Sequence, residues 1–191
     1  MRNLFKNIAL SFSFLFMVAT ITSCSEKDLT TSSALRSIES YLEYKPQYES
    51  TTIQLGETKL KTQKDADLIA AYKDLETTGL LALETKDLKK KWLSKDSIWN
   101  VNLKLTDLAA PYVIDQKNNK VTVKSFEYLV NKEKPIEIHN KNKKSASITV
   151  MLSKQPTPFA VLAKDKNPNT NFITKKFKLK FSEEMGWEVA N

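Results

Sequence analysis

The chain has 191 residues, of which 41% are hydrophobic and 27% are charged, and its formal net charge at pH 7 is +8. This composition predicts a globular protein with a hydrophobic core. The chain holds only three glycines, one histidine and one cysteine. These counts argue against a glycine-rich phosphate loop, and they exclude a paired-histidine zinc site and a disulfide bond within the chain.

The first apolar segment covers residues 8–21 and reads IALSFSFLFMVATI. It follows Arg2 and Lys6, and no acidic residue precedes Glu26. A transmembrane helix needs about 20 apolar residues, so this run is too short to span a bilayer. A basic start followed by a short apolar stretch is instead typical of a secretory signal peptide.

The segment ends in Ile21-Thr22-Ser23-Cys24, which resembles the lipobox of bacterial lipoproteins: an aliphatic residue, two small residues and a cysteine. The resemblance implies that residues 1–23 are a signal peptide, that diacylglycerol is attached to the Cys24 sulfur, and that the new amino terminus is acylated. One acyl chain binds a membrane only marginally, whereas several chains give durable anchoring. The alternative is a signal peptide cut nearby that leaves Cys24 as a free thiol.

The residues after Cys24 indicate where such a lipoprotein would reside. Ser25 follows the cysteine, in place of the aspartate that resembles an inner-membrane retention signal. We therefore expect a cell-envelope protein, which in a Gram-negative cell resides at the outer membrane and faces the periplasm or is exposed at the cell surface. Residues 24–31, CSEKDLTT, are predicted to be a polar tether between the lipid and the fold.

Two helices are expected in the first third of the mature chain. Residues 32–44 carry apolar side chains at helical spacing, with Ser32 or Ser33 as the cap and Pro46 as the stop. A short strand or hairpin around Gly56 follows. The second helix is predicted to have Asp65 as its N-cap and Gly79 at its C-terminal cap, with its apolar face formed by Leu68, Ile69, Tyr72 and Leu75.

Strand signals dominate the remainder. Residues 79–93 are either a strand leading into a helix or a hairpin with exposed lysines. Alternation predicts a strand over residues 99–105, and the polar stretch 115–120 is the best internal boundary. Further strands are predicted around residues 121–130, 136–138, 146–152, 177–181 and 187–189, with a bulge near Lys124-Ser125.

These elements predict an α+β fold. Two N-terminal helices with short strands would be followed by a mainly antiparallel sheet of about five strands. Residues 32–191 would form one domain, or two lobes that divide near 115–120.

Two segments of the middle region resemble part of a known fold. YKDLETTGLLAL followed by WNVNLKLTDLAAPYV resembles the helix, turn and wing of winged-helix domains over roughly residues 65–113. The glycine that normally follows the leucine-threonine pair is absent, because Asp107 and Leu108 stand there. The resemblance implies a shape and carries no implication of DNA binding.

Charge is divided unevenly along the chain. Residues 24–85 hold seven basic and eleven acidic side chains, whereas residues 86–191 hold 21 lysines and eleven acids. Two lysine groups are candidate surfaces for an anionic ligand or partner: Lys176, Lys178 and Lys180 on one strand face, and Lys89, Lys90 and Lys91. The alternative is that these lysines only keep a strand edge soluble. Nucleic acid is not an expected partner, because Arg36 is the one arginine after Cys24 and bidentate recognition of phosphates and bases favours arginine.

No catalytic group, metal site or cofactor is predicted. His139 lies in IEIHN with no second histidine to join it, and Glu183-Glu184 and Asp65 have structural explanations. Trp92, beside the lysine run, is a candidate aromatic contact, whereas Trp99 and Trp187 are expected in the core. We therefore expect a membrane-anchored, non-enzymatic binding or structural module whose partner is an envelope protein or an acidic glycan or lipid. The alternative is an accessory lipoprotein that binds or processes carbohydrate.

Overall fold

The computed structural model describes residues 28–90, 96–139, 141–166 and 168–190, and these residues are mainly β structure. Strands account for 51% of them and helices for 24%. The predicted α+β fold is therefore wrong. The helices do not form an N-terminal pair, because the second α-helix follows two strands and precedes eight more.

The described elements are two α-helices, two short 3-10 helices and ten strands. The helices are α1 (Thr31–Tyr44), α2 (Ala66–Thr77), η1 (Asp107–Tyr112) and η2 (Pro158–Leu162). The first strands are β1 (Gln47–Gln54), β2 (Gly56–Lys61), β3 (Leu81–Lys90), β4 (Ser97–Leu105) and β5 (Val113–Lys117). The later strands are β6 (Lys120–Val130), β7 (Glu137–His139), β8 (Ser145–Pro156), β9 (Phe172–Ser182) and β10 (Gly186–Val189).

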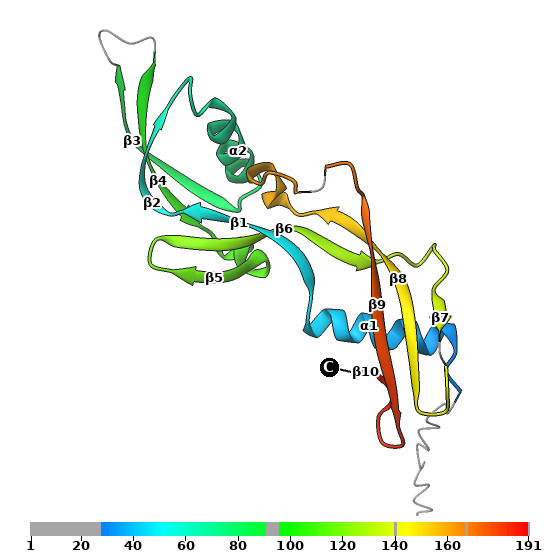
Figure 1. The fold of residues 1–191 in the computed structure, drawn as a ribbon. Coiled ribbons are helices and arrows are strands. Elements are labelled where there is room, and N and C mark those ends of the chain that lie inside the picture. The colour runs from blue at the N-terminus through cyan, green and yellow to red at the C-terminus, as the bar shows by residue number, and fades with distance from the viewer. Residues whose placement is uncertain (1–27, 91–95, 140, 167, 191) are drawn as a thin grey trace, which may run out of the picture.

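The strands form two antiparallel sheets. The larger has the order β1-β6-β8-β9-β10, with β5 added to β6 and β7 added to β8, and the smaller has the order β2-β4-β3. Figure 1 shows an elongated molecule in which the β3–β4 hairpin and the turn between β9 and β10 lie at opposite ends. Gly56, the first residue of β2, has a φ of 82°, and this turn of the backbone lets consecutive strands enter different sheets.

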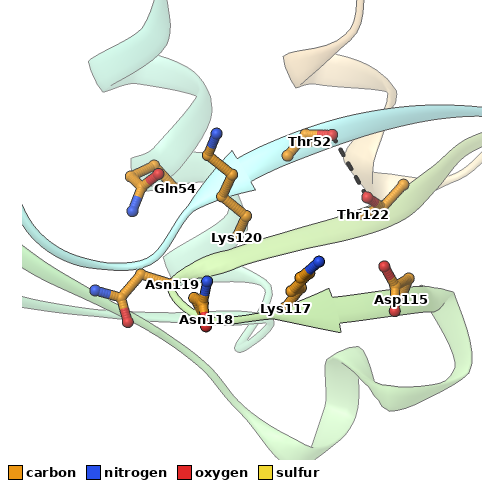
Figure 2. A pocket seen from close by; sticks show the side chains of 8 residues that line it. All are labelled: Thr52, Gln54, Asp115, Lys117, Asn118, Asn119, Lys120 and Thr122. Carbon is orange, nitrogen blue, oxygen red and sulfur yellow. Dashed lines mark hydrogen bonds between the residues drawn. The ribbon is translucent and has the colours of Figure 1, made fainter.

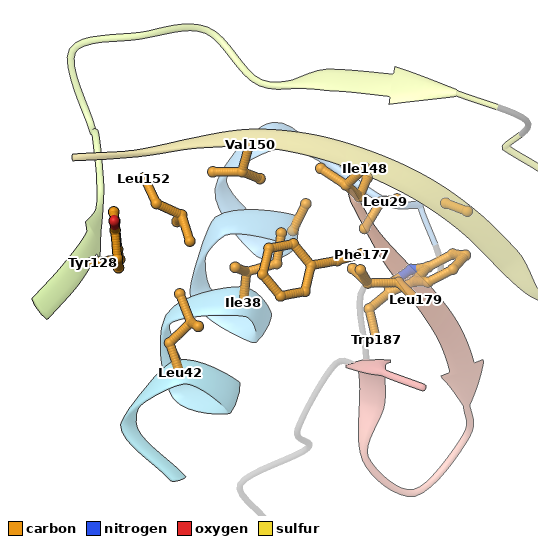
Figure 3. Packing of buried hydrophobic residues seen from close by; sticks show 12 residues of the cluster. Leu29, Ile38, Leu42, Tyr128, Ile148, Val150, Leu152, Phe177, Leu179 and Trp187 are labelled. Carbon is orange, nitrogen blue, oxygen red and sulfur yellow. The ribbon is translucent and has the colours of Figure 1, made fainter. Parts of the chain in front are cut away.

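Helix α1 packs on the larger sheet and forms the first core. Thr30, not Ser32 or Ser33, caps the helix, in a capping box with the side chain of Ser33. Ile38 and Leu42 point from α1 towards the side chains of β8 and β9, as Figure 3 shows. The buried members of this core are Leu29, Ala34, Ile38, Leu42, Tyr128, Ala146, Ile148, Val150, Leu152, Phe177, Leu179 and Trp187.

Helix α2 and the smaller sheet contribute to a second core, together with β1, β6, η1 and η2. The predicted cap at Gly79 is confirmed. Gly79 has a φ of 74°, its N–H donates to the Glu76 carbonyl, and the Leu80 N–H donates to the Leu75 carbonyl. These two bonds form a Schellman motif, and Leu75 and Leu80 both enter the second core.

A bulge in β6 keeps one face of the larger sheet turned towards both cores. The predicted irregularity near Lys124-Ser125 is confirmed, because Glu49 pairs with Phe126 and Ser50 with Lys124, which leaves Ser125 as the extra residue. The odd-numbered residues of β1 share one face of the sheet. Their partners on β6 are odd-numbered before the bulge (Val121 and Val123) and even-numbered after it (Phe126 and Tyr128), so all four point to that same face. The Thr157 hydroxyl donates to the Lys124 carbonyl at 2.6 Å and supports the bulge from η2.

The sequence prediction failed where strands lack an apolar face. The second half of β3 carries lysines and Leu88, which is 61% exposed, and it pairs with β4 as a hairpin arm. The hairpin reading of residues 79–93 is thus correct for the part that is described. The start of β1 is equally polar, because Gln47 and Glu49 face a cluster of charges and not the core.

Candidate functional site

The predicted lysine row lies on the outer face of β9. Lys176, Lys178 and Lys180 are exposed, whereas Phe177 and Leu179 between them are buried in the first core. The three lysines pair across the strand with Thr149, Ser147 and Ser145 of β8. Within the described residues none of their ammonium groups forms an ion pair. The alternation is therefore confirmed, and whether the row binds a partner stays a prediction.

The structure does not bring the two lysine groups together. Lys89 and Lys90 end β3, at the opposite end of the molecule from the last residues of β9 (Figure 1). Lys89 Nζ lies 3.4 Å from a carboxylate oxygen of Asp87, with 71% of the lysine side chain exposed. Lys91, Trp92 and Cys24 lie outside the described residues.

The remaining candidate residues contact neighbouring groups of the fold. His139 is exposed on β7, and its Nε2 lies 3.3 Å from Glu137 Oε2 on the same face. The Asp65 carboxylate accepts a hydrogen bond from the Lys61 N–H at 2.7 Å. Trp187 is buried in the first core and Trp99 packs against the second, as predicted.

The described residues contain no group of three histidine, cysteine or acidic residues arranged to hold a metal ion. They also contain no helix that is long and apolar enough to cross a membrane.

A buried cluster of charges, which the sequence did not predict, lies between the two cores. Lys154 on β8 has a side chain that is only 5% exposed, and its Nζ is 3.2 Å from Oε1 of Glu49. It also bonds the Asp165 carboxylate and lies 4.2 Å from the centre of the Phe126 ring. Tyr128 Oη donates to the same Glu49 oxygen at 2.7 Å.

The pKa values of this cluster show that its charges are paired. Burial opposes ionisation of Glu49, but hydrogen bonds from Tyr128 and Lys154 outweigh it and lower the carboxyl pKa. Burial likewise opposes the charge on Lys154, but its bonds to Asp165 and Glu49 raise the lysine pKa. Burial and the Glu49 carboxylate raise the pKa of Tyr128.

This cluster has a structural role. Each of its charged groups bonds another member of the cluster. Asp165 belongs to the long segment between β8 and β9, and its bond to Lys154 holds that segment against the sheet. The cluster therefore links β1, β6 and β8 to the segment that follows η2.

An open polar hollow lies at the β5–β6 hairpin, on the face of the larger sheet that points away from the cores. We call it the hairpin hollow; it measures about 750 Å³ and is lined by Thr52, Gln54, Asp115, Lys117, Asn118, Asn119, Lys120 and Thr122. Figure 2 shows these side chains on three neighbouring strands and the turn that joins two of them. The predicted boundary at residues 115–120 thus falls at the tip of this hairpin.

Strand register sets the order of groups in the hairpin hollow. One row runs from Thr52 through Thr122 to Asp115, and the next from Gln54 through Lys120 to Lys117. The Thr52 and Thr122 hydroxyl oxygens are 3.5 Å apart. Neither lysine forms an ion pair with another described residue. The hollow therefore offers two ammonium groups without an ion-pair partner among the described residues, together with the Asp115 carboxylate and amide and hydroxyl groups.

The turn of the hairpin is fixed by local chemistry. Asn118 has a φ of 54°, a left-handed conformation that asparagine tolerates better than most side chains. The Leu55 N–H donates to the Asn119 carbonyl at 2.7 Å and ties the turn to the end of β1. The sequence signal was present as Asn118-Asn119 between lysines, but it indicates a turn and does not reveal which strand lies beside it.

Comparison with known proteins adds no relative: no family model, no curated protein and no solved structure matches the chain.

Proposed function

We propose that this protein is a lipid-anchored binding module of a bacterial cell envelope, whose hairpin hollow binds an acidic glycan. The anchor rests on the lipobox-like ITSC at residues 21–24 and on the basic, short apolar segment before it. Acylation at Cys24 attaches the domain to the membrane by its N-terminal end.

The observation that carries the ligand proposal is that polar side chains of three neighbouring strands line the hairpin hollow. Lys117 and Lys120 supply positive charge for sugar carboxylates, and Gln54 and the two asparagines supply amide donors and acceptors for hydroxyl groups. The strands that line the hollow, β1, β5 and β6, contribute to the half of the molecule built around the second core, and Figure 1 shows the β5–β6 hairpin well away from the first residues of α1.

The lining also sets the kind of binding. None of the eight side chains that line the hairpin hollow is aromatic, so the sugar is held by hydrogen bonds and charge and not by ring stacking. We expect an open, polar site of this kind to bind its ligand weakly, because surface ion pairs contribute about 1 kcal/mol or less each. It should nevertheless distinguish a charged sugar from a neutral one.

The test uses residues 25–191, which include every described residue. Isothermal titration calorimetry compares an oligogalacturonate with a neutral glucan of equal length at moderate salt. We expect saturable binding of the acidic oligosaccharide, at least tenfold tighter than that of the glucan. Lys117→Gln with Lys120→Gln should abolish the preference, and Lys89→Gln with Lys90→Gln is the matched control. Equal binding of both sugars, or an unchanged preference in the first variant, would contradict the glycan proposal.

A further inference from the structure

The first described residue lies against a second hollow at the end of the molecule that the tether enters. We call this the tether hollow; it measures about 810 Å³, and its lining includes Asp28, Lys141, Lys143, Lys144, Phe181 and Glu183. These residues come from the start of the fold, the β7–β8 loop, the end of β9 and the β9–β10 turn. Figure 1 shows this loop and this turn at the same end of the larger sheet.

The hollow is held in shape by hydrogen bonds. The Asn142 side chain accepts from the Lys144 and Ser145 N–H groups at 2.9 and 2.7 Å and closes the loop. The Phe181 N–H donates to the Lys144 carbonyl at 3.0 Å and joins the loop to β9. Lys141 Nζ donates to the Leu29 carbonyl at 3.0 Å and fixes the point where the chain enters the fold.

The tether is too short to direct any other end towards the membrane. Three residues separate Asp28 from Cys24, so their Cα atoms are at most about 14 Å apart in a fully extended chain. Strand β9 has eleven residues, which at about 3.3 Å per residue makes the sheet about 36 Å long. An acylated Cys24 therefore places the tether hollow next to the lipid headgroups, and this step rests on the lipid anchor proposed above.

The charges of the hollow match a headgroup that carries both signs. Lys143 and Lys144 form no ion pair with another described residue, and neither do Asp28 and Glu183. Three lysines against two carboxylates give little net attraction to an anionic surface, where each unopposed basic residue contributes about 1 kcal/mol. Groups of both signs instead line the same hollow, together with the Phe181 ring.

We infer that the tether hollow binds the headgroup of a zwitterionic phospholipid of the phosphoethanolamine class. The phosphate is bound by the ammonium groups of Lys143 and Lys144. The lipid ammonium donates to the Asp28 and Glu183 carboxylates and lies near the Phe181 ring. Binding orients the domain on the membrane and fixes the direction in which the hairpin hollow is presented.

The experiment uses the full chain, expressed with its leader and purified from bacterial membranes into nanodiscs. Met185 is 69% exposed in the β9–β10 turn, so Met185→Cys carries an environment-sensitive fluorophore beside the hollow. A lipidated Cys24 has no free thiol, and labelling then gives one dye per chain. The discs contain phosphatidylcholine alone, or phosphatidylcholine mixed with phosphatidylethanolamine or with phosphatidylglycerol.

We expect dye emission at least twofold higher in ethanolamine-containing discs than in the other two. Lys143→Glu with Lys144→Glu should reduce it to the phosphatidylcholine value, while Lys89→Glu with Lys90→Glu, at the far end, leaves it unchanged. Equal emission in all three discs, or the highest emission with phosphatidylglycerol, would overturn the inference and leave the anchor intact. Two dyes per chain would show that Cys24 carries no lipid, and the proposed anchor and the inference would fail together.

Discussion

Replacing Lys154 with methionine tests the charge cluster that joins the two cores. Methionine keeps an unbranched side chain that is one atom shorter, and it removes the ammonium group with its positive charge and its hydrogen-bond donors. Glu49, whose side chain is 9% exposed, then keeps Tyr128 as its hydrogen-bond donor and loses the cation 3.2 Å away. Asp165 loses its bond to the sheet as well.

The magnitude follows from burial. Removing one partner of a buried ion pair costs about 3–5 kcal/mol, because the other charge stays buried without compensation. The Asp165 side chain is 31% exposed and water can solvate it, so we expect the lower end, about 3 kcal/mol. With a urea m-value of about 2 kcal/mol per molar, the unfolding midpoint falls by about 1.5 M.

Urea unfolding at pH 7, followed by circular dichroism, measures this loss. The matched control is Lys132→Met, which breaks an ion pair of 2.8 Å whose lysine side chain is 74% exposed. Such a surface pair contributes at most about 1 kcal/mol. If Lys154→Met costs no more than the control, the cluster does not hold the two halves together and the reasoning is refuted.

Four further results are expected. Folding lowers the pKa of Glu49, so its stabilisation is present above the unfolded value of 4.5 and is lost as pH falls through the folded value. The difference in unfolding free energy between wild type and Lys154→Met should therefore shrink below about pH 4.5 in urea titrations. The contributions of Lys154 and Tyr128, whose pKa values are raised, are complete below about pH 10 and are lost at higher pH. Ile38→Ala, at a fully buried position of α1, should cost about 2–5 kcal/mol by thermal unfolding. Gly79→Ala, at a φ of 74°, should cost about 1–2 kcal/mol in the same assay, and a neutral result would argue against the helix cap.

Local signals predicted individual elements well. The span of α1, the Gly79 cap and the strand predicted over residues 99–105, which the structure shows as Ser97–Leu105, each follow from spacing within a short window. The bulge at Ser125 was predictable because the apolar residues of β6 change parity there. These features depend on neighbours in the chain, which the sequence displays directly.

The fold class could not be predicted in the same way. Gln47 and Glu49 extend β1 because their side chains bond Lys175, Tyr128 and Lys154, which are far away in sequence. Such a strand has no apolar alternation. The lysine arm of β3 also lacks an apolar face, so the β content was underestimated.

The candidate sites show the same limit. The alternation of Lys176, Lys178 and Lys180 was readable because it lies within one strand. The tether hollow was not, because Asp28, the loop around Lys143 and the β9–β10 turn meet only after the sheet has formed. Acidic and basic residues that are far apart in the sequence line one hollow there.

The lipid anchor is the central claim, and the mass of the mature protein tests it most directly. The full chain is expressed in a Gram-negative host, extracted from the membrane fraction and analysed by intact mass spectrometry. Loss of residues 1–23 with a diacylglyceryl group and a fatty acyl chain added at Cys24 is the predicted result. A chain cut elsewhere, or one beginning near residue 24 with an unmodified thiol, would contradict the account.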